Sequence, residues 1–320
     1  MLKNAGPEFV SGEEMAKSLY VTRAGIWKAV RTLEREGCDI EAVTNRGYRL
    51  KPRKDYISSE AVEADLKGRG LEVKVFYYEE TDSTNLRAQA LSGEYDGNLL
   101  VIAGAQTKGR GRKGRSFFSP EDTGIYMSFL LRNGESMAEL SNITANAAVA
   151  TARAIDSEAF GGRDVTKIKW VNDLYLGDRK VTGILSEGFT DLETGGFSVV
   201  IGIGINVFKP SHGFPDDIRD KAGSLEEGGA RLTADVRNRI ISETVANIMY
   251  FHANPKESLK IYRDKSNLMG CYVKINTFTD TKAEKYAKVT GIDEDCHLLV
   301  EYDDGRREAL SSGEVSVVKY

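Results

Sequence analysis

The chain has 320 residues, of which 41% are hydrophobic and 29% charged, and its net charge is −4. This length suits two or three domains, and no apolar run approaches the ~20 residues of a membrane span. No signal peptide is predicted, because charged residues and a Gly-Pro pair fall within the first eight positions; three widely spaced cysteines without metal-ligand spacing favour a cytoplasmic protein with free thiols.

The N-terminal segment, residues 1–53, is predicted to be a winged helix-turn-helix domain. Ser11 caps a first helix, and Thr22 caps a second helix over residues 23–36, which a glycine ends. A hairpin over residues 38–50, with glycine at its tip, would form the wing. Ten Lys and Arg against seven Asp and Glu make the segment net positive. A small helical protein-interaction module is the alternative interpretation.

In a winged helix-turn-helix the second helix enters the major groove, and the wing contacts phosphates. Ile26, Val30 and Leu33 form the apolar stripe of that helix and should face the core. The candidate DNA contacts lie largely off this stripe or on the wing; they are Thr22, Arg23, Lys28, Arg31, Arg46 and Arg49.

The start of the chain departs from a complete domain of this type. Only residues 1–4 precede Ala5-Gly6-Pro7, which is too short for the helix that usually covers the other two. Either the true start lies upstream, inside a longer helix, or the DNA-binding domain is incomplete. We therefore expect the chain as given to expose Ile26, Val30 and Leu33 and to bind DNA poorly.

Residues 54–268 are predicted to form an α+β domain with a mixed sheet and helices on one side, because strands outnumber helical crossovers. A polar turn over residues 82–85 should cap one of the helices. Strands are expected at residues 73–78, 98–105, 124–131, 167–189 and 197–207, and helices at 59–67, 86–91, 137–160, 233–251 and 255–264.

The basic loop, residues 109–115 (GRGRKGR), holds three glycines and four cations directly after Lys108. Such a segment should not be stable alone as helix or strand, so we expect an anion to complete it. Glycine lets the backbone approach a phosphate, and Arg offers paired donors to carboxylate and phosphate oxygens. Taken alone, the loop is equally consistent with a solvated basic loop or a non-specific nucleic-acid patch.

Three later segments point to a ligand. Residues 169–176 (KWVNDLYL) indicate two strands joined by a tight Asn-Asp turn, and residues 179–185 (RKVTGIL) place Lys180 at the start of an apolar strand. Residues 201–206 (IGIGIN) alternate isoleucine with glycine and end on Asn206. This alternation leaves one face bare, so that a flat ligand could lie against the backbone. Singly, each segment is also consistent with an ordinary buried strand.

Together and in this order, the motifs resemble those of the biotin protein ligases, in particular the bacterial bifunctional ligases that also repress the biotin operon. The resemblance covers essentially the whole chain and includes the helix-turn-helix pattern at the N-terminus. Its motifs are residues 81–85 (TDSTN), Gln106 with the basic loop, residues 169–173 (KWVND), Lys180 with residues 183–185, residues 202–206 (GIGIN) and residues 311–315 (SSGEV).

The resemblance implies a class II synthetase-like catalytic domain followed by a small SH3-like β-barrel. Residues 269–320 fit such a barrel, and a turn at residues 303–305 would join two of its strands. This barrel is expected to help dock ATP or the acceptor protein, and a purely structural role is the alternative. Strands are expected at residues 272–278, 283–292, 297–302 and 306–310.

The resemblance also implies a two-step reaction. The carboxylate of biotin attacks the α-phosphorus of ATP to give biotinyl-5′-AMP, and biotin then passes to a lysine of the biotin carboxyl carrier protein. Mg²⁺ is expected on the triphosphate, because this ion keeps several waters and needs few protein ligands. Catalytic roles fall to Lys180, Arg112 and Asp173. Asp173 would orient or deprotonate the incoming amine, and metal binding or capping of its own turn are the alternatives.

Two sets of binding residues are implied by similarity. The biotin-binding set is Ser83, Thr84, Asn85, Gln106, Gly109, Arg110, Gly111, Arg112, Lys180, Gly183, Gly202 and Gly204. The adenylate-binding set is Arg110, Arg112, Arg115, Asn172, Lys180 and Asn206. Val171 stands where the family often has proline, and Phe117 where tryptophan is common. Neither change removes a charge, so activity is still expected.

The implied partners are the carrier protein, operator DNA and a second copy of the chain, with biotinyl-5′-AMP as corepressor favouring the homodimer. Two other functions stay open. One is a ligase with a non-functional DNA-binding module, and the other is a non-enzymatic transcription factor that senses a ligand. Lys180 with Arg110 and Arg112 argues against a sensor, because sensing needs no phosphoryl-transfer lysine. A lipoate ligase fits the basic loop and the KWVND turn less well.

Overall fold

The computed structural model describes residues 1–2, 5, 8–35, 40–44, 46–50, 56–132, 140–190, 196–276 and 285–318. The chain separates into two compact units. One unit comprises Met1–Tyr56 with Thr233–Asp235, and the other comprises Ile57–Leu232 with Val236–Tyr320. Within the described ranges, no helix has the length and apolar character needed to cross a membrane.

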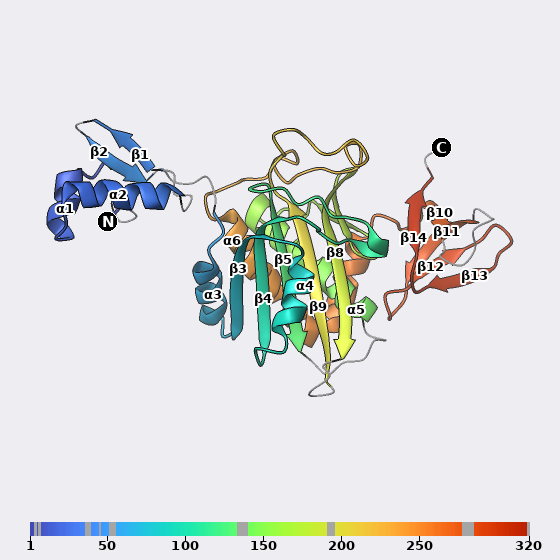
Figure 1. Ribbon diagram of the computed structural model, residues 1–320. Coiled ribbons are helices and arrows are strands. Elements are labelled where there is room, and N and C mark those ends of the chain that lie inside the picture. The colour runs from blue at the N-terminus through green and yellow to red at the C-terminus, as the bar shows by residue number, and fades with distance from the viewer. Residues whose placement is uncertain are drawn as a thin grey trace. The chain divides into compact units, whose positions relative to one another are not determined.

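The first unit contains two helices and a hairpin, as predicted (Figure 1). The helices are α1 (Gly12–Ser18) and α2 (Arg23–Arg35), and the antiparallel strands are β1 (Ile40–Val43) and β2 (Gly47–Leu50). Ser11 Oγ accepts a hydrogen bond from the Glu14 amide at 3.0 Å, and Thr22 Oγ1 accepts one from the Gly25 amide at 3.1 Å. Both predicted caps are therefore confirmed. The glycine expected to end α2 lies outside the described residues.

The core of this unit corrects the expectation that α2 is left uncovered. Ile26 and Val30 are buried in a cluster with side chains of α1 and β1, and Leu2 and Ala5 pack against the same cluster. Of the predicted stripe, Leu33 is the residue that is exposed. Leu2 and Ala5, which precede α1, thus contribute apolar contacts to this core.

A seven-stranded sheet in the order β3-β4-β5-β9-β8-β7-β6 forms the centre of the second unit. Strands β3 and β4 are parallel, and the remaining neighbours are antiparallel, so the predicted mixed sheet is confirmed. The three strands predicted within residues 167–189, the first two of them joined by the Asn-Asp turn, are confirmed as β6, β7 and β8. The strands are β3 (Val73–Thr81), β4 (Asn98–Gln106), β5 (Gly124–Arg132), β6 (Thr166–Lys169), β7 (Asp173–Leu176), β8 (Arg179–Thr190) and β9 (Phe197–Asn206).

The expectation that the helices lie on one side of this sheet is wrong for α4 (Thr84–Leu91). Helices α3 (Ser59–Gly68), α5 (Leu140–Phe160), α6 (Val236–Ala253) and α7 (Pro255–Lys265) belong to one core, whereas α4 packs on the opposite face (Figure 1). The central strands are apolar on both faces: Leu100 of β4 contributes to the first core and Leu99 to the second. Both faces therefore need cover.

The C-terminal part of the second unit is a five-stranded antiparallel sheet in the order β13-β12-β11-β10-β14. The predicted turn at residues 303–305 joins β12 to β13, and Gly305 there has a φ of +80°. The last strand, β14, was not predicted. The strands are β10 (Tyr272–Asn276), β11 (Lys285–Ile292), β12 (Leu298–Glu301), β13 (Arg307–Leu310) and β14 (Glu314–Val317).

Candidate active site

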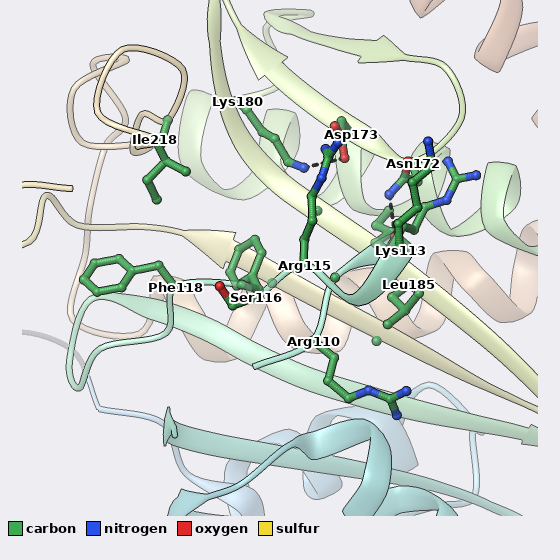
Figure 2. A pocket seen from close by; sticks show the side chains of 18 of the residues that line it. Arg110, Lys113, Arg115, Ser116, Phe118, Asn172, Asp173, Lys180, Leu185 and Ile218 are labelled. Carbon is green, nitrogen blue, oxygen red and sulfur yellow. Dashed lines mark hydrogen bonds and ion pairs between the residues drawn. The ribbon is translucent and has the colours of Figure 1, made fainter. Parts of the chain in front are cut away.

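A cavity of about 500 Å³ in the second unit gathers most of the predicted site residues (Figure 2). Its walls come from the start of α4, the end of β4, the basic loop, strands β7 to β9, the segment around residues 214–222 and the start of β14. The predicted residues that line it are Ser83, Thr84, Asn85, Gln106, Arg110, Gly111, Arg112, Arg115, Asn172, Asp173, Lys180, Gly183, Gly202, Gly204 and Asn206.

One end of the cavity is neutral and polar, and Gln106 organises it. Parallel pairing of β3 with β4 sets Thr81 opposite Gln106, so the end of β4 meets the start of α4. Gln106 Oε1 accepts hydrogen bonds from the Thr84 amide at 2.9 Å and from Thr84 Oγ1 at 3.2 Å, while its Nε2 donates to Ser119 Oγ at 2.9 Å. The cap of α4 is thus supplied by Gln106. This corrects the expectation of a cap within the turn, since Ser83 makes no side-chain cap bond.

Ser128 joins this polar end from strand β5. Its Oγ lies 2.7 Å from Thr84 Oγ1 and 2.6 Å from Asn85 Oδ1. The side-chain amide nitrogen of Asn85 in turn donates to the Glu187 carboxylate at 2.8 Å and more weakly to the Leu185 carbonyl at 3.3 Å. Because each of these buried side chains is fixed by its neighbours, the polar end is ordered before any ligand arrives.

The basic loop closes on itself through its backbone. The Gly111 amide donates to the Arg115 carbonyl at 2.7 Å, and the Phe117 amide donates to the Gly109 carbonyl at 2.8 Å. Residues Arg112–Gly114 form a single 3₁₀ turn. Gly109 is absent from the described cavity lining, because its α-carbon packs under the Phe117 carbonyl and Ser119. Glycine here lets the loop backbone pack closely against Phe117 and Ser119, and the expected contact with a ligand stays a prediction.

Carboxylates of the protein pair with Arg110, Lys113 and Arg115, whereas Arg112 contacts a neutral side chain. The ligand anion expected at the loop stays a prediction. Arg110 pairs with Glu187 at 3.0 Å, and Arg115 forms a bidentate pair with Glu314 at 2.8 and 2.6 Å. Arg112 donates to the neutral Asn172 Oδ1 at 3.1 Å. The hydrogen bond from Arg115 is the largest cause that lowers the pKa of Glu314, to about 2.

The second, cationic end of the cavity centres on Lys180 and Asp173. Their Nζ and Oδ1 atoms lie 2.6 Å apart, and Figure 2 shows the two side chains meeting beside Arg115. Antiparallel pairing of β7 with β8 brings the two side chains together. The side-chain amide of Asn172 holds the preceding turn by donating to the Ile184 carbonyl at 2.7 Å. A lysine, an arginine and a carboxylate thus share one wall, which can bind phosphate and hold a proton acceptor near it.

The glycines of β8 and β9 form the floor of the cavity. A Cβ at Gly204 would overlap the ring of Phe117, one at Gly202 would overlap the Asn85 amide, and one at Gly183 would lie 3.2 Å from Phe117. The bare face predicted from the alternation is therefore real, but side chains of the protein already lie on part of it. The Asn206 side chain at the end of β9 donates to the Gly223 carbonyl at 3.0 Å.

Comparison with known proteins agrees with this geometry. Residues 75–206 match the biotin/lipoate A/B protein ligase family, residues 1–49 match an HTH domain, and residues 273–318 match the biotin protein ligase C-terminal domain. Over 316 residues the chain is 32% identical to the bifunctional ligase/repressor BirA of Bacillus subtilis, covering 98% of this chain and 95% of that protein. The chain belongs to the family of bifunctional biotin ligase/repressors.

Two further relatives extend the match. The ligase/repressor BirA of Salmonella typhimurium is 28% identical over 323 residues, covering 98% of this chain and 94% of that protein. The biotin protein ligase from Aquifex aeolicus in complex with biotin and ATP superposes with a TM-score of 0.62 at 28% identity, covering 77% of this chain and 99% of that chain. The central and C-terminal fold is thus that of a biotin protein ligase.

In this family member the predicted DNA contacts lie in the first unit. Arg23 and Lys28 are exposed on α2, and Arg31 lies over the ring of Trp27, 5.5 Å from its centroid. Arg46 and Arg49 of the hairpin lie 4.4 and 4.6 Å from the centroid of the Phe9 ring, and Arg49 also pairs with Glu41. Trp27 was missed by sequence reasoning, although an aromatic residue off the apolar stripe of a basic helix was a usable signal.

Several residues that line the ligase cavity or support its lining were also missed. Ser128 carried a signal, because it is a polar residue inside the apolar strand β5. Lys169 lines the cavity, and burial lowers its pKa while the charges of Asp173 and Glu314 oppose that effect. Burial raises the pKa of the neighbouring Tyr175 to about 12. Phe214, Ile218 and Lys221 line the cavity from a segment that no motif marked.

Proposed function

We propose that the chain is an ATP-dependent biotin protein ligase that also represses transcription of biotin synthesis genes. The main support for the ligase function is that one cavity joins a neutral, hydrogen-bonding end at Gln106 to a cationic end at Lys180. Biotin has a neutral ureido ring at one end and a carboxylate at the other, so the two ends of the cavity match the two ends of this substrate.

In the first step, the biotin carboxylate attacks the α-phosphorus of ATP and pyrophosphate leaves. Both reactants are anions, so bringing them together is the first electrostatic cost. Lys180 and Arg112 offset it and stabilise the charge that develops on the phosphoryl group. Ser83, Thr84 and Gln106 would hydrogen-bond the ureido ring at the other end. Asn206 would contact the adenylate, and a closed basic loop would keep water from the mixed anhydride.

In the second step, the amine of an acceptor lysine attacks the activated carbonyl and AMP leaves. The mixed anhydride needs no further activation, so a protein nucleophile is not required. Asp173 would orient or deprotonate the amine, since its carboxylate lies in the cavity wall within 2.6 Å of Lys180. The acceptor would be the biotin carboxyl carrier protein.

Mg²⁺ would enter with the triphosphate of ATP. The carboxylate oxygens of Asp173 are the hard donors that this ion prefers, and few protein ligands are needed because the ion keeps phosphate oxygens and waters. When bound, the ion neutralises phosphate charge and lowers the cost of approach for the biotin carboxylate.

The repressor function rests on the first unit and its exposed basic residues. Biotinyl-5′-AMP, the product of the first step, would act as corepressor and favour a homodimer, whose two-fold symmetry suits a palindromic operator. With ATP as substrate and the carrier protein and operator DNA as partners, the proposed function would be carried out in the cytoplasm. We assign DNA binding to residues 1–53, catalysis to residues 54–268 and the C-terminal sheet to residues 269–320.

An ATP-dependent biotinylation assay on a purified carrier domain tests the ligase. Biotin transfer with release of one pyrophosphate per biotin supports the proposal. Biotin binding without pyrophosphate release would favour the ligand-sensing transcription factor. A mobility shift with duplexes selected from a random pool, with and without biotinyl-5′-AMP, then separates the repressor from a ligase with a non-functional DNA-binding module.

A further inference from the structure

Arg110 is directed to strand β8 and not to the cationic end of the cavity. Its guanidinium Nη2 lies 3.0 Å from Glu187 Oε1, and the two side chains are 42% and 34% exposed. Figure 2 shows the Arg110 side chain pointing away from Lys180 and Asp173. The first cation of the basic loop is therefore compensated by the protein's own carboxylate.

Glu187 uses its other oxygen on the polar end of the cavity. Its Oε2 accepts a hydrogen bond of 2.8 Å from the Asn85 amide. Asn85 is buried, and it lies so close over Gly202 that a Cβ at that position would overlap it. One carboxylate thus bridges a side chain of the basic loop and a tightly held side chain of α4.

The bridge continues a path of hydrogen bonds through the site. Asn85 Oδ1 accepts a hydrogen bond from Ser128 Oγ at 2.6 Å, and Thr84 Oγ1 lies 2.7 Å from that Oγ. The path ends at Gln106 Oε1, which accepts a hydrogen bond from the Thr84 backbone amide at 2.9 Å. The side chain that would read the ureido ring is therefore linked to the loop that would cover it. Networks of this kind resist rearrangement of one member alone.

We propose that Glu187 is a positioning residue for biotin, and that Arg110 acts as a strut between the loop and β8 and not as an anion ligand. The inference rests on the proposed ligase function. A guanidinium whose charge a carboxylate already compensates attracts a second anion less strongly than Arg112, whose described partner is the neutral Asn172. The strut seats the loop over the ring-binding end, so its loss should weaken biotin binding and leave ATP binding intact.

Charge reversal tests this assignment. The single variants Arg110→Glu and Glu187→Arg each place like charges together, whereas the double variant restores an opposite pair with its ends exchanged. We expect each single change, and the isosteric Glu187→Gln, to raise the KM for biotin roughly tenfold, with the KM for ATP changed less than about twofold. The double variant should recover most of that loss. Glu187→Gln keeps the test informative where a charge reversal impairs folding.

Two results would overturn the inference. A double variant no better than the worse single variant would mean that Arg110 contacts the ligand itself. A Glu187→Gln enzyme with the biotin KM of the wild type would mean that Glu187 positions nothing. A wild-type chain that neither releases pyrophosphate nor transfers biotin would instead refute the proposed function, so the two failures are distinguishable.

The pair formed by Arg239 of α6 and Glu158 of α5 provides a matched control. Its Nε to Oε2 distance is 2.8 Å, its side chains are 39% and 21% exposed, and neither residue is in the described cavity lining. The same charge reversal there should lower the melting temperature and leave the KM for biotin unchanged. A change in biotin KM at this control pair would reduce the Glu187 effect to general destabilisation and overturn the inference.

Discussion

The ring of Phe117 lies directly on the α-carbon of Gly204. An added Cβ at residue 204 would overlap ring atoms Cε1, Cζ and Cδ1, so glycine at this position is required by the ring. Gly183 on the neighbouring strand gives the same ring its second contact. Phe117, two residues beyond the basic loop, therefore packs on the cavity floor against two glycines of adjacent strands.

Gly204→Ala should displace the Phe117 ring and with it the end of the basic loop. We expect a loss of about 1–3 kcal/mol in the free energy of unfolding, as for other overpacked sites, and a raised KM for biotin. Gly291→Ala on β11 is the control, because its Cβ would meet only Leu299 at an ordinary contact distance of 3.4 Å. Chemical denaturation and steady-state kinetics measure both effects. Equal behaviour of the two variants would contradict the seating of Phe117.

Lys180→Ala should slow adenylate formation by roughly 10²–10³-fold, since it removes a cation that stabilises charge in the transition state. Biotin binding should weaken much less than this, because the side chains that would bind the ureido ring keep their hydrogen bonds. Pyrophosphate exchange and calorimetry measure the two quantities. Lys209→Ala is the control, since Lys209 pairs with Glu227 and is not among the described cavity residues. Full adenylation by Lys180→Ala would remove Lys180 from the mechanism.

The Arg115–Glu314 pair should make stability depend on pH at the acid side. The pKa of Glu314 is lowered from 4.5 to about 2, so the pair stabilises the folded chain fully above pH 4.5. That contribution is lost as the pH falls from 4.5 to 2. The partial exposure of the pair limits it to about 1 kcal/mol or less. The difference in unfolding free energy between wild type and Glu314→Gln should therefore be present at pH 7 and vanish near pH 2; a difference that is constant with pH would argue against this pair.

Trp27 should report DNA binding by its fluorescence. Its side chain is exposed among the basic residues of α2, whereas the chain's other tryptophan, Trp170, is buried and donates to the Cys296 carbonyl at 2.8 Å. Contact with bases or phosphates should change the emission of Trp27 and leave that of Trp170 unchanged. The change should disappear in Trp27→Phe and weaken with added salt. Unaltered emission at a DNA concentration that gives a full mobility shift would place Trp27 outside the interface.

Local patterns predicted much of this molecule. The caps at Ser11 and Thr22 depend on neighbouring residues, and the alternation of residues 201–206 depends on strand geometry alone, so both could be read directly. The position of α4 could not, because it depends on which face of a two-sided apolar sheet is left uncovered by the other helices. The general identity of the site followed from its motifs.

The partners of the basic loop were beyond sequence reasoning. Glu314 follows Arg115 by 199 positions in the chain, and Glu187 is brought beside Arg110 only by the pairing of the sheet. A run of cations indicates that carboxylates should pair with it, but it does not indicate which carboxylates these are. Likewise, Gln106 caps α4 because two parallel strands end together, which is a property of the assembled sheet.

The Thr84 backbone amide competes with the substrate for a hydrogen bond to the side-chain oxygen of Gln106. A ligand that draws the Gln106 carbonyl oxygen to itself leaves the first turn of α4 without its cap, which typically costs a helix ~1 kcal/mol. Biotin binding and the unwinding of the first turn of α4 are therefore thermodynamically coupled. Substitutions on the solvent side of α4 that raise or lower its helix propensity would therefore tune biotin binding without ever touching the ligand.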